Sequence, residues 1–204
     1  MFTGIVQAKG RIVAAGSGPD RLRLAIAPGH LDTDDIRIGD SVAVNGCCLT
    51  VVELRKVTDG TQLLFDVSAE TIRCTTGLAA PGPVNLEKAL RLADRLGGHL
   101  MTGHVDGVGE VVAFAAVTGD TGGSWRLEIA APEALSRFIA AKGSIAVQGV
   151  SLTVNGVEGR RFHVNLIPHT LAATTLGTLS AGDPVNLEVD LVARYVQRLS
   201  STEL

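Results

Sequence analysis

The chain has 204 residues, with 18 basic and 21 acidic side chains and a formal net charge of −3, and 46% of its residues are hydrophobic. So much apolar material over this length favours a buried core and excludes a disordered chain. Aromatic residues make up only 3% and there is no excess of positive charge; both facts argue against nucleic-acid binding, which uses stacking rings and a basic face.

The same composition bears on the compartment. No apolar run approaches the roughly 18 residues of a membrane span, and residues 1–6 do not have the pattern of a signal peptide. The cysteines, Cys47, Cys48 and Cys74, are odd in number and two are adjacent, which suits neither a disulfide framework nor a zinc site. We therefore expect a soluble cytoplasmic protein with reduced thiols, no bound metal and no membrane contact.

The first half of the chain predicts short β-strands. Val, Leu and Thr are concentrated in segments bounded by Gly, Asp, Asn or Pro, namely Ser41–Val44, Leu49–Leu54, Leu63–Val67 and Val84–Leu86. The apolar alternation changes phase after Asn45-Gly46, and again after Gln148-Gly149 in the second half. A phase change at glycine predicts a tight turn or a bulge.

Three segments have helical spacing instead. Leu86 to Leu96 ends at Gly97-Gly98, a common helix stop, and Pro132 to Lys142 begins with proline and an acid. The third predicted helix runs from Asp190, a plausible N-cap, to Leu199 and carries an apolar stripe. That stripe must be covered either by a barrel or by copies of itself in an oligomer.

The chain also repeats itself at a distance of roughly 100 residues. Five blocks recur in the same order: 4–6 as 103–105, 41–51 as 144–154, 65–71 as 164–170, 75–76 as 174–175, and 83–87 as 184–188. We therefore predict a mainly β protein made of two tandem similar small closed β-barrels with short helices, over residues 1–97 and 98–189, followed by a C-terminal helix over 190–204.

Residues shared by the two halves are candidates for a shared ligand. Thr50 matches Thr153, and Thr71 matches Thr170; these hydroxyls could bind a polar heterocycle or sugar chain, although threonine also simply favours strands. Cys48 matches Ser151 and is either a nucleophile or a small buried hydrophobe.

The junction between the halves holds His99 and His104 among glycines. They could transfer protons near neutral pH, lie in a surface turn, or bind zinc, although no further ligand stands at metal spacing. Lys142 and Asp190 can be explained as favourable charges at the ends of the predicted helices, the first at a C-terminus and the second at an N-terminus. No Rossmann or P-loop motif is present, so the residues alone indicate a duplicated barrel with paired small-molecule sites and no evident cofactor.

The chain as a whole resembles the riboflavin synthases of the single-polypeptide type. The resemblance covers roughly residues 1–199 and rests on residues 1–6, 45–50, 70–71, 97–104, 149–154, 167–168 with Thr170, and Asp190 with 194–196. It implies a cofactor-free transferase reaction, the last step of riboflavin biosynthesis. Two molecules of 6,7-dimethyl-8-ribityllumazine exchange a four-carbon unit and give riboflavin and 5-amino-6-ribitylamino-pyrimidinedione.

The resemblance also implies an assembly. The family forms homotrimers held partly by the C-terminal helix, and the reacting pair meets between the N-terminal barrel of one subunit and the C-terminal barrel of another. An association with lumazine synthase is a further expectation. Lumazine- and flavin-binding antenna proteins share the fold, so a non-catalytic binding module is the alternative.

Site residues are carried over by similarity. Catalytic positions are Cys48, Ser41, His104, Thr153 and Asp190, with His104 or Ser41 assisting proton transfer. Substrate-binding positions are Gly4, Ile5, Val6, Cys48, Leu49, Thr50, Asp66, Val67, Ser68, Ala69, Glu70, Thr71, Gly103, His104, Val105, Lys142, Ser151, Leu152, Thr153, Asn165, Leu166, Ile167, Pro168, His169 and Thr170. Gln148 stands where the family commonly has an acid and cannot supply a carboxylate base.

Overall fold

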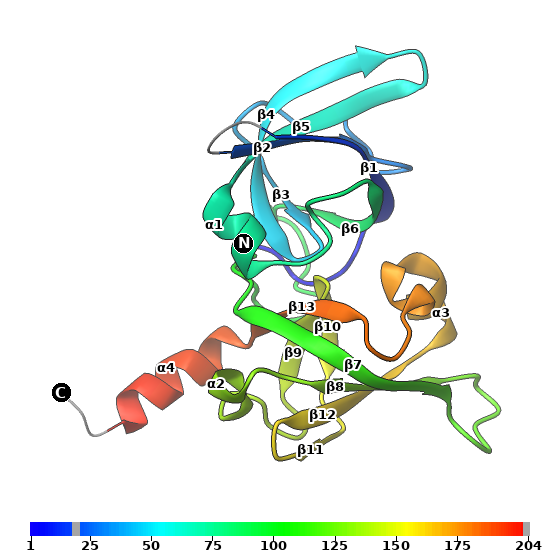
Figure 1. Ribbon diagram of the computed structural model, residues 1–204, viewed down its shortest axis with the longest axis vertical. Helices are drawn as coiled ribbons and strands as arrows, with labels where there is room; N and C mark the ends of the chain where they lie inside the picture. Colours follow the sequence, from blue (N-terminus) through cyan, green and yellow to red (C-terminus); the bar gives the residue numbers. More distant parts are fainter. Residues whose placement is uncertain (18–20, 202–204) are drawn as a thin grey trace.

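The computed structural model describes residues 1–17 and 21–201, and it places two β units one above the other along the long axis of the molecule (Figure 1). The upper unit is a closed antiparallel barrel with strand order β1-β2-β5-β4-β3-β6. Its strands are β1 (Ala8–Ser17), β2 (Arg21–Ala27), β3 (Ser41–Val44), β4 (Cys47–Val57), β5 (Gly60–Ser68) and β6 (Gly82–Lys88). The barrel closes because β6 pairs with both β1 and β3.

The second unit is a curled seven-stranded sheet in the order β10-β9-β13-β7-β8-β12-β11. Its strands are β7 (Gly107–Ala116), β8 (Trp125–Ala130), β9 (Ser144–Val147), β10 (Val150–Thr153), β11 (Gly156–Glu158), β12 (Arg161–Leu166) and β13 (Pro184–Val189). The long strand β4 of the first unit has two short counterparts here, β10 and β11, with Val154 and Asn155 between them. Since β10 and β11 are the two edges of the sheet, this short link requires the sheet to curl until its edges meet.

The mainly β prediction is therefore confirmed, as are the four predicted strands of the first half. Both phase changes are tight hairpin turns. Asn45 and Gly46 have φ of 48° and 82°, and Gln148 and Gly149 have 50° and 77°. Two successive positive φ angles define the type I′ turn, whose twist matches that of the flanking strands.

The helix predicted from Leu86 to Leu96 is wrong. Leu86 lies in β6, where it pairs with Ala8 on one side and Val44 on the other, and the segment after β6 contains turns without a helix. The apolar spacing was misleading because Leu96, one of its positions, is exposed, while barrel closure requires residues 82–88 as a strand. The helix predicted over Pro132 to Lys142 is reduced to one turn, α2 (Glu133–Ser136).

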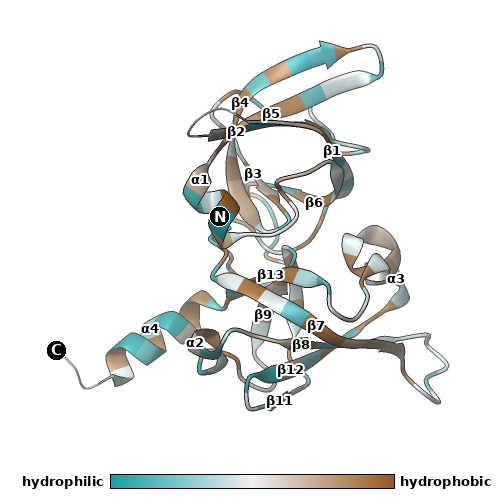
Figure 2. Ribbon diagram, viewed as in Figure 1, coloured by the Kyte–Doolittle hydropathy of each residue, from teal (hydrophilic) through white to brown (hydrophobic). Residues whose placement is uncertain are grey.

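The C-terminal helix α4 (Leu191–Ser200) is confirmed, and the Asp190 side chain accepts a hydrogen bond from the Val192 backbone N–H at 2.9 Å. The helix points away from both β units (Figure 1). Its hydrophobic residues alternate with hydrophilic ones (Figure 2), and Val192, Tyr195, Val196 and Leu199 are all exposed. No helix within the described residues is long and apolar enough to cross a membrane.

Short helices follow the equivalent strands β5 and β12. They are α1 (Ala69–Cys74), α3 (Pro168–Ala173) and a 3-10 turn, η1 (Thr175–Thr178). Each β unit encloses its own aliphatic core, and a third, smaller cluster joins them through Phe2, Ala43, Met101 and Ala146. The site is built around this third cluster.

Candidate functional site

The junction between the β units is built from equivalent residues of the two halves. Phe2 and Met101 form a two-hydrogen-bond bridge, with N···O distances of 2.8 and 3.0 Å. The two type I′ turns also meet there, since a Cβ on Gly46 would lie 2.8 Å from the Gly149 backbone nitrogen. Only glycine allows the two backbones to approach so closely.

Each half sends the segment before its first strand across to the other half. The Ser151 N–H donates to the Gly4 carbonyl at 2.8 Å, and Val6 packs against the core of the second unit. In the same way the Cys48 N–H donates to the Gly103 carbonyl at 2.8 Å, and Val105 packs against the core of the first unit. The predicted segments Gly4–Val6 and Gly103–Val105 therefore each belong spatially to the opposite half.

One group of predicted site residues lies around β4 in the first unit. Gly103–Val105 lies against β4 at Cys48, and Thr50 of β4 pairs with Ser41 of β3. The next residue of β4, Val51, pairs with Phe65 of β5, and residues 66–71 continue through the end of β5 into α1.

An equivalent group of predicted site residues lies around β10 in the second unit. Gly4–Val6 lies against β10 at Ser151, and Thr153 pairs with Ser144 of β9. Asn165 is joined to the link between β10 and β11, because its N–H donates to the Asn155 side chain at 3.1 Å. Residues 165–170 then lead from β12 into α3.

Polar side chains of residues 66–71 bond to other residues of the first unit. The Ser68 hydroxyl caps α1 by accepting from the Thr71 N–H at 3.1 Å. Glu70 is paired with Arg73 at 2.6 Å, and this hydrogen bond lowers the pKa of the Glu70 carboxyl. Asp66 forms an ion pair with Arg23 at 2.7 Å. These contacts fix the shape of the segment between β5 and α1.

His99 is the histidine that the structure joins to a predicted site residue. Its Nδ1 lies 2.7 Å from the Ser151 hydroxyl, and among the described residues nothing hydrogen-bonds its buried Nε2. Burial lowers the pKa of His99, while the negative charge of Asp190 opposes that shift. His104, by contrast, is exposed, and its backbone N–H donates to the Thr102 hydroxyl at 3.3 Å.

The adjacent cysteines differ in access. Cys47 is buried, and burial raises the pKa of its thiol to about 12. Cys48 is partly exposed beside Gly103. A thiol must reach the ligand and ionise to react, so of this pair only Cys48 suits chemistry.

Lys142, Gln148 and Asp190 lie in three different settings, of which that of Asp190 is the N-terminus of α4. Lys142 has a φ of 69° and donates its N–H to the Val154 carbonyl at 2.7 Å, next to Thr153, with its side chain exposed. Gln148 is buried in the turn, where its side-chain oxygen accepts from the Asn186 N–H at 3.2 Å. The Gln148 side chain therefore stabilises the junction through this hydrogen bond.

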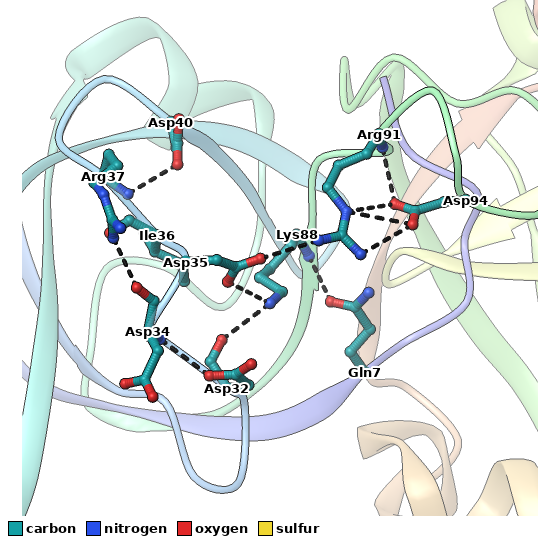
Figure 3. Close-up of polar contacts among 10 residues, drawn as sticks. All are labelled: Gln7, Asp32, Asp34, Asp35, Ile36, Arg37, Asp40, Lys88, Arg91 and Asp94. Carbon is teal, nitrogen blue, oxygen red and sulfur yellow. Dashed lines mark hydrogen bonds and ion pairs between the residues drawn. The ribbon is translucent and has the colours of Figure 1, made fainter.

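Two neighbouring cavities of about 390 and 290 Å³ open beside the junction. The larger is lined by Thr3, Ile5 and Glu87 among others, and the smaller by Ser41. Figure 3 shows the charged residues at their rim: Lys88 pairs with Asp35 at 2.6 Å, and Arg91 pairs with Asp94 at 3.1 Å.

Three residues at this junction were missed by the sequence reasoning. Ser144 is the counterpart of Ser41, and Glu87 and Glu188 end the repeated block that also contains Asn85 and Asn186. The repeat could have indicated Glu87 and Glu188, because the same acid stands at equivalent positions of both halves.

Comparison with known proteins identifies the repeated unit. A model of the lumazine binding domain matches the chain twice, over residues 3–89 and 102–190. The riboflavin synthase of Mycobacterium tuberculosis is 46% identical over 205 residues, with 98% of each chain covered. That of Photobacterium phosphoreum is 41% identical and covers 98% of this chain and 88% of the relative.

Solved structures show the same relationship. LumP complexed with riboflavin aligns with a TM-score of 0.78 at 30% identity, covering 93% of this chain and 99% of LumP. LumP complexed with 6,7-dimethyl-8-(1'-D-ribityl) lumazine aligns with a TM-score of 0.75 at 28% identity and the same coverage. With two lumazine binding domains and relatives that match it from end to end, the chain belongs to the riboflavin synthase family.

Proposed function

We propose that the protein is a riboflavin synthase that converts two molecules of 6,7-dimethyl-8-ribityllumazine into riboflavin and 5-amino-6-ribitylamino-pyrimidinedione by four-carbon-unit transfer, without a cofactor. The observation that carries the proposal is the duplication: two equivalent groups of residues, each completed by a segment of the other half. A reaction between two identical molecules needs two similar sites. The identity to riboflavin synthases over the whole chain supports this choice.

The reaction assigns different tasks to the two sites. The methyl group on ring position seven of one lumazine must lose a proton, and a nucleophile can add at the same ring position of the other. Cys48 and Ser41 serve the first site, and Thr153 with Asp190 serves the second, while His104 or Ser41 assists proton transfer. The remaining substrate-binding positions hold the heterocycles and ribityl chains, many of them through backbone groups.

Holding both rings in register is the main catalytic contribution in this proposal. Well-oriented reactants can lower a barrier by about 7–11 kcal/mol by removing the loss of translational and rotational entropy from the reaction step. The two rings also stack on one another, which suits a chain with few aromatic residues of its own.

The proposed assembly is a homotrimer in which α4 packs against neighbouring subunits. Four exposed apolar residues on α4, which points away from its own β units, support this. The first lumazine-binding domain would span 1–97, the second 98–189, and the assembly helix 190–204. Light scattering on purified protein should give three times the mass of the 21.2 kDa chain; a stable monomer would remove the shared site between subunits.

Two smaller proposals accompany the assembly. The free thiols Cys47, Cys48 and Cys74 suit a reducing compartment, and we place the enzyme in the cytoplasm. An association with lumazine synthase would deliver the substrate, and co-purification of the two proteins tests it.

The alternative is a binding module without turnover, because solved relatives include LumP complexes with lumazine, riboflavin and flavin mononucleotide. Cys48, His104, Ser41 and Asp190 together favour the enzyme. Incubating the protein with the lumazine alone separates the two functions. Riboflavin fluorescence should grow in; tight binding with no riboflavin would establish the binding module instead.

A further inference from the structure

Two buried glutamates occupy equivalent places in the two halves, and the proposed reaction assigns no role to either of them. Glu87 near the end of β6 is 4% exposed, and Glu188 near the end of β13 is 5% exposed. Burying a carboxylate is unfavourable unless hydrogen bonds compensate it. Their partners are therefore informative.

Each carboxylate accepts three hydrogen bonds from one short segment. Glu87 Oε1 accepts from the Thr3 N–H at 2.7 Å and the Thr3 hydroxyl at 2.8 Å, and its Oε2 accepts from the Gly4 N–H at 3.0 Å. The Thr3 hydroxyl in turn accepts from the Ile5 N–H at 3.2 Å. Successive N–H groups converging on one anion form a backbone nest, and Gly4 has the positive φ of 75° that such a turn requires.

Glu188 repeats this arrangement in the other half. Its Oε1 accepts from the Thr102 N–H at 2.6 Å and the Thr102 hydroxyl at 2.8 Å, and its Oε2 accepts from the Gly103 N–H at 3.0 Å. Gly103 has a φ of 78°. Two independent copies of one device in a single chain indicate a shared task.

That task follows from where the held segments go. Gly4 donates its N–H to Glu87, and its carbonyl accepts from Ser151 in the second unit. In the same way Gly103 donates its N–H to Glu188, and its carbonyl accepts from Cys48 in the first unit. We infer that Glu87 and Glu188 are crossed positioning residues: Glu87, in the first half, shapes the ligand site of the second, and Glu188, in the second half, shapes the ligand site of the first. The inference rests on the proposed function for its catalytic consequence, but its geometry stands independently.

The ionised form satisfies the geometry. In each glutamate, both carboxylate oxygens accept hydrogen bonds from backbone N–H groups. A backbone N–H can only donate, so a protonated carboxyl group would find no acceptor there. Burial raises the pKa of Glu87 and Glu188, and the hydrogen bonds from Thr3, Gly4, Thr102 and Gly103 oppose that shift. Glutamine cannot replace either residue, because its NH₂ group would face an N–H whichever way the amide is turned.

The test replaces each acid in turn and examines the opposite half. In Glu188→Gln, hydrogen exchange at the Cys48 amide, which bonds to Gly103, should accelerate about tenfold, with exchange at Ser151 unchanged. Glu87→Gln should accelerate Ser151 and leave Cys48 unchanged. Mass spectrometry on peptides covering 45–52 and 148–155 reads both amides in the intact protein.

Further outcomes and a second pair of variants complete the test. Equal acceleration of both amides in each variant would mean general destabilisation and would overturn the inference, as would acceleration confined to the mutated half. Should the glutamine variants fail to fold, Thr3→Val and Thr102→Val remove only the hydroxyl bonds, and must give the same crossed pattern in weaker form. In riboflavin formation, each glutamine variant should lower kcat/KM about tenfold.

The riboflavin assay and the hydrogen-exchange test can contradict the proposed function and the positioning role independently. A wild-type protein that makes no riboflavin from the lumazine contradicts the proposed function and leaves the exchange result to decide the crossed positioning. A wild-type enzyme whose glutamine variants show uncrossed exchange contradicts the positioning alone.

Discussion

The two halves of the molecule share a backbone plan and differ in their side-chain chemistry. In both, a type I′ turn leads into the strand that carries the site, and a buried glutamate fixes the crossing segment. At the central position, however, the first half has Cys48 and the second has Ser151, which is hydrogen-bonded to His99. Among the described residues no side chain forms an equivalent bond to the Cys48 thiol.

That difference suits a reaction between identical molecules. Two copies of one substrate need matching binding surfaces, yet one must give up a four-carbon unit and the other must receive it. A duplicated scaffold supplies the match, and in the proposed reaction the divergence at Cys48, Ser151 and His99 would distinguish the two molecules. The junction keeps both sites in fixed relation because its turns and crossing segments allow no extra atoms.

The largest effect is expected when the first half is made chemically like the second. Cys48→Ser should lower kcat about a hundredfold, within the usual range for loss of a catalytic group, while lumazine affinity changes less than about twofold. Steady-state kinetics and fluorescence titration measure the two quantities. Cys74→Ser in α1 is the matched control and should retain turnover; a Cys48→Ser enzyme with the wild-type rate contradicts the assigned role.

The crossing itself can be broken at its glycines. A Cβ on Gly103 would lie 2.6 Å from the Cys48 Cβ, and one on Gly4 would lie 2.6 Å from the Ser151 Cβ, both at positive φ. Each alanine variant should lose about 2 kcal/mol or more of unfolding free energy in urea. Gly39→Ala has a positive φ but open space around it, so it should lose only about 1 kcal/mol. Equal losses at Gly39 and Gly103 would show that the close approach does not matter.

The smallest effect concerns His99, which lies in the second half. Because burial lowers its pKa, the unfolded chain takes up the proton first as pH falls from 7, at about 6.5. Its contribution to stability is therefore present above that pH and is lost as pH falls through the lowered folded pKa. Thermal melts at pH 7.5 to 5 should show a flatter pH dependence for His99→Gln than for the wild type. The exposed His30→Gln serves as control and should keep the wild-type slope; an unchanged slope in His99→Gln would contradict the buried neutral state.

Sequence patterns predicted what depends on neighbours in the chain. The turns at Asn45-Gly46 and Gln148-Gly149 and the cap of α4 at Asp190 involve residues only a few positions apart. Residues 86–96 misled because barrel closure, a long-range requirement, overrides the helical spacing of Leu86. The bond between His99 and Ser151 spans 52 positions and has no local signature.

The crossed glutamates are an intermediate case. The repeated block ending in Glu87 and Glu188 is visible in the sequence, but the sequence reasoning used it only as evidence of the repeat and assigned the two acids no role. Their partners Thr3 and Thr102 lie 84 and 86 positions away. Only the folded chain shows that each acid holds a segment belonging to the opposite site.

The central claim is that each chain offers two lumazine sites, one on each half. Calorimetric titration of the slowed Cys48→Ser protein with 6,7-dimethyl-8-ribityllumazine tests it most directly, since turnover depletes the ligand about a hundredfold more slowly than in the wild type. The account predicts two molecules bound per chain, falling towards one when the crossing segment of a single half is displaced by Glu87→Gln or Glu188→Gln. One molecule per chain in the Cys48→Ser protein would contradict it.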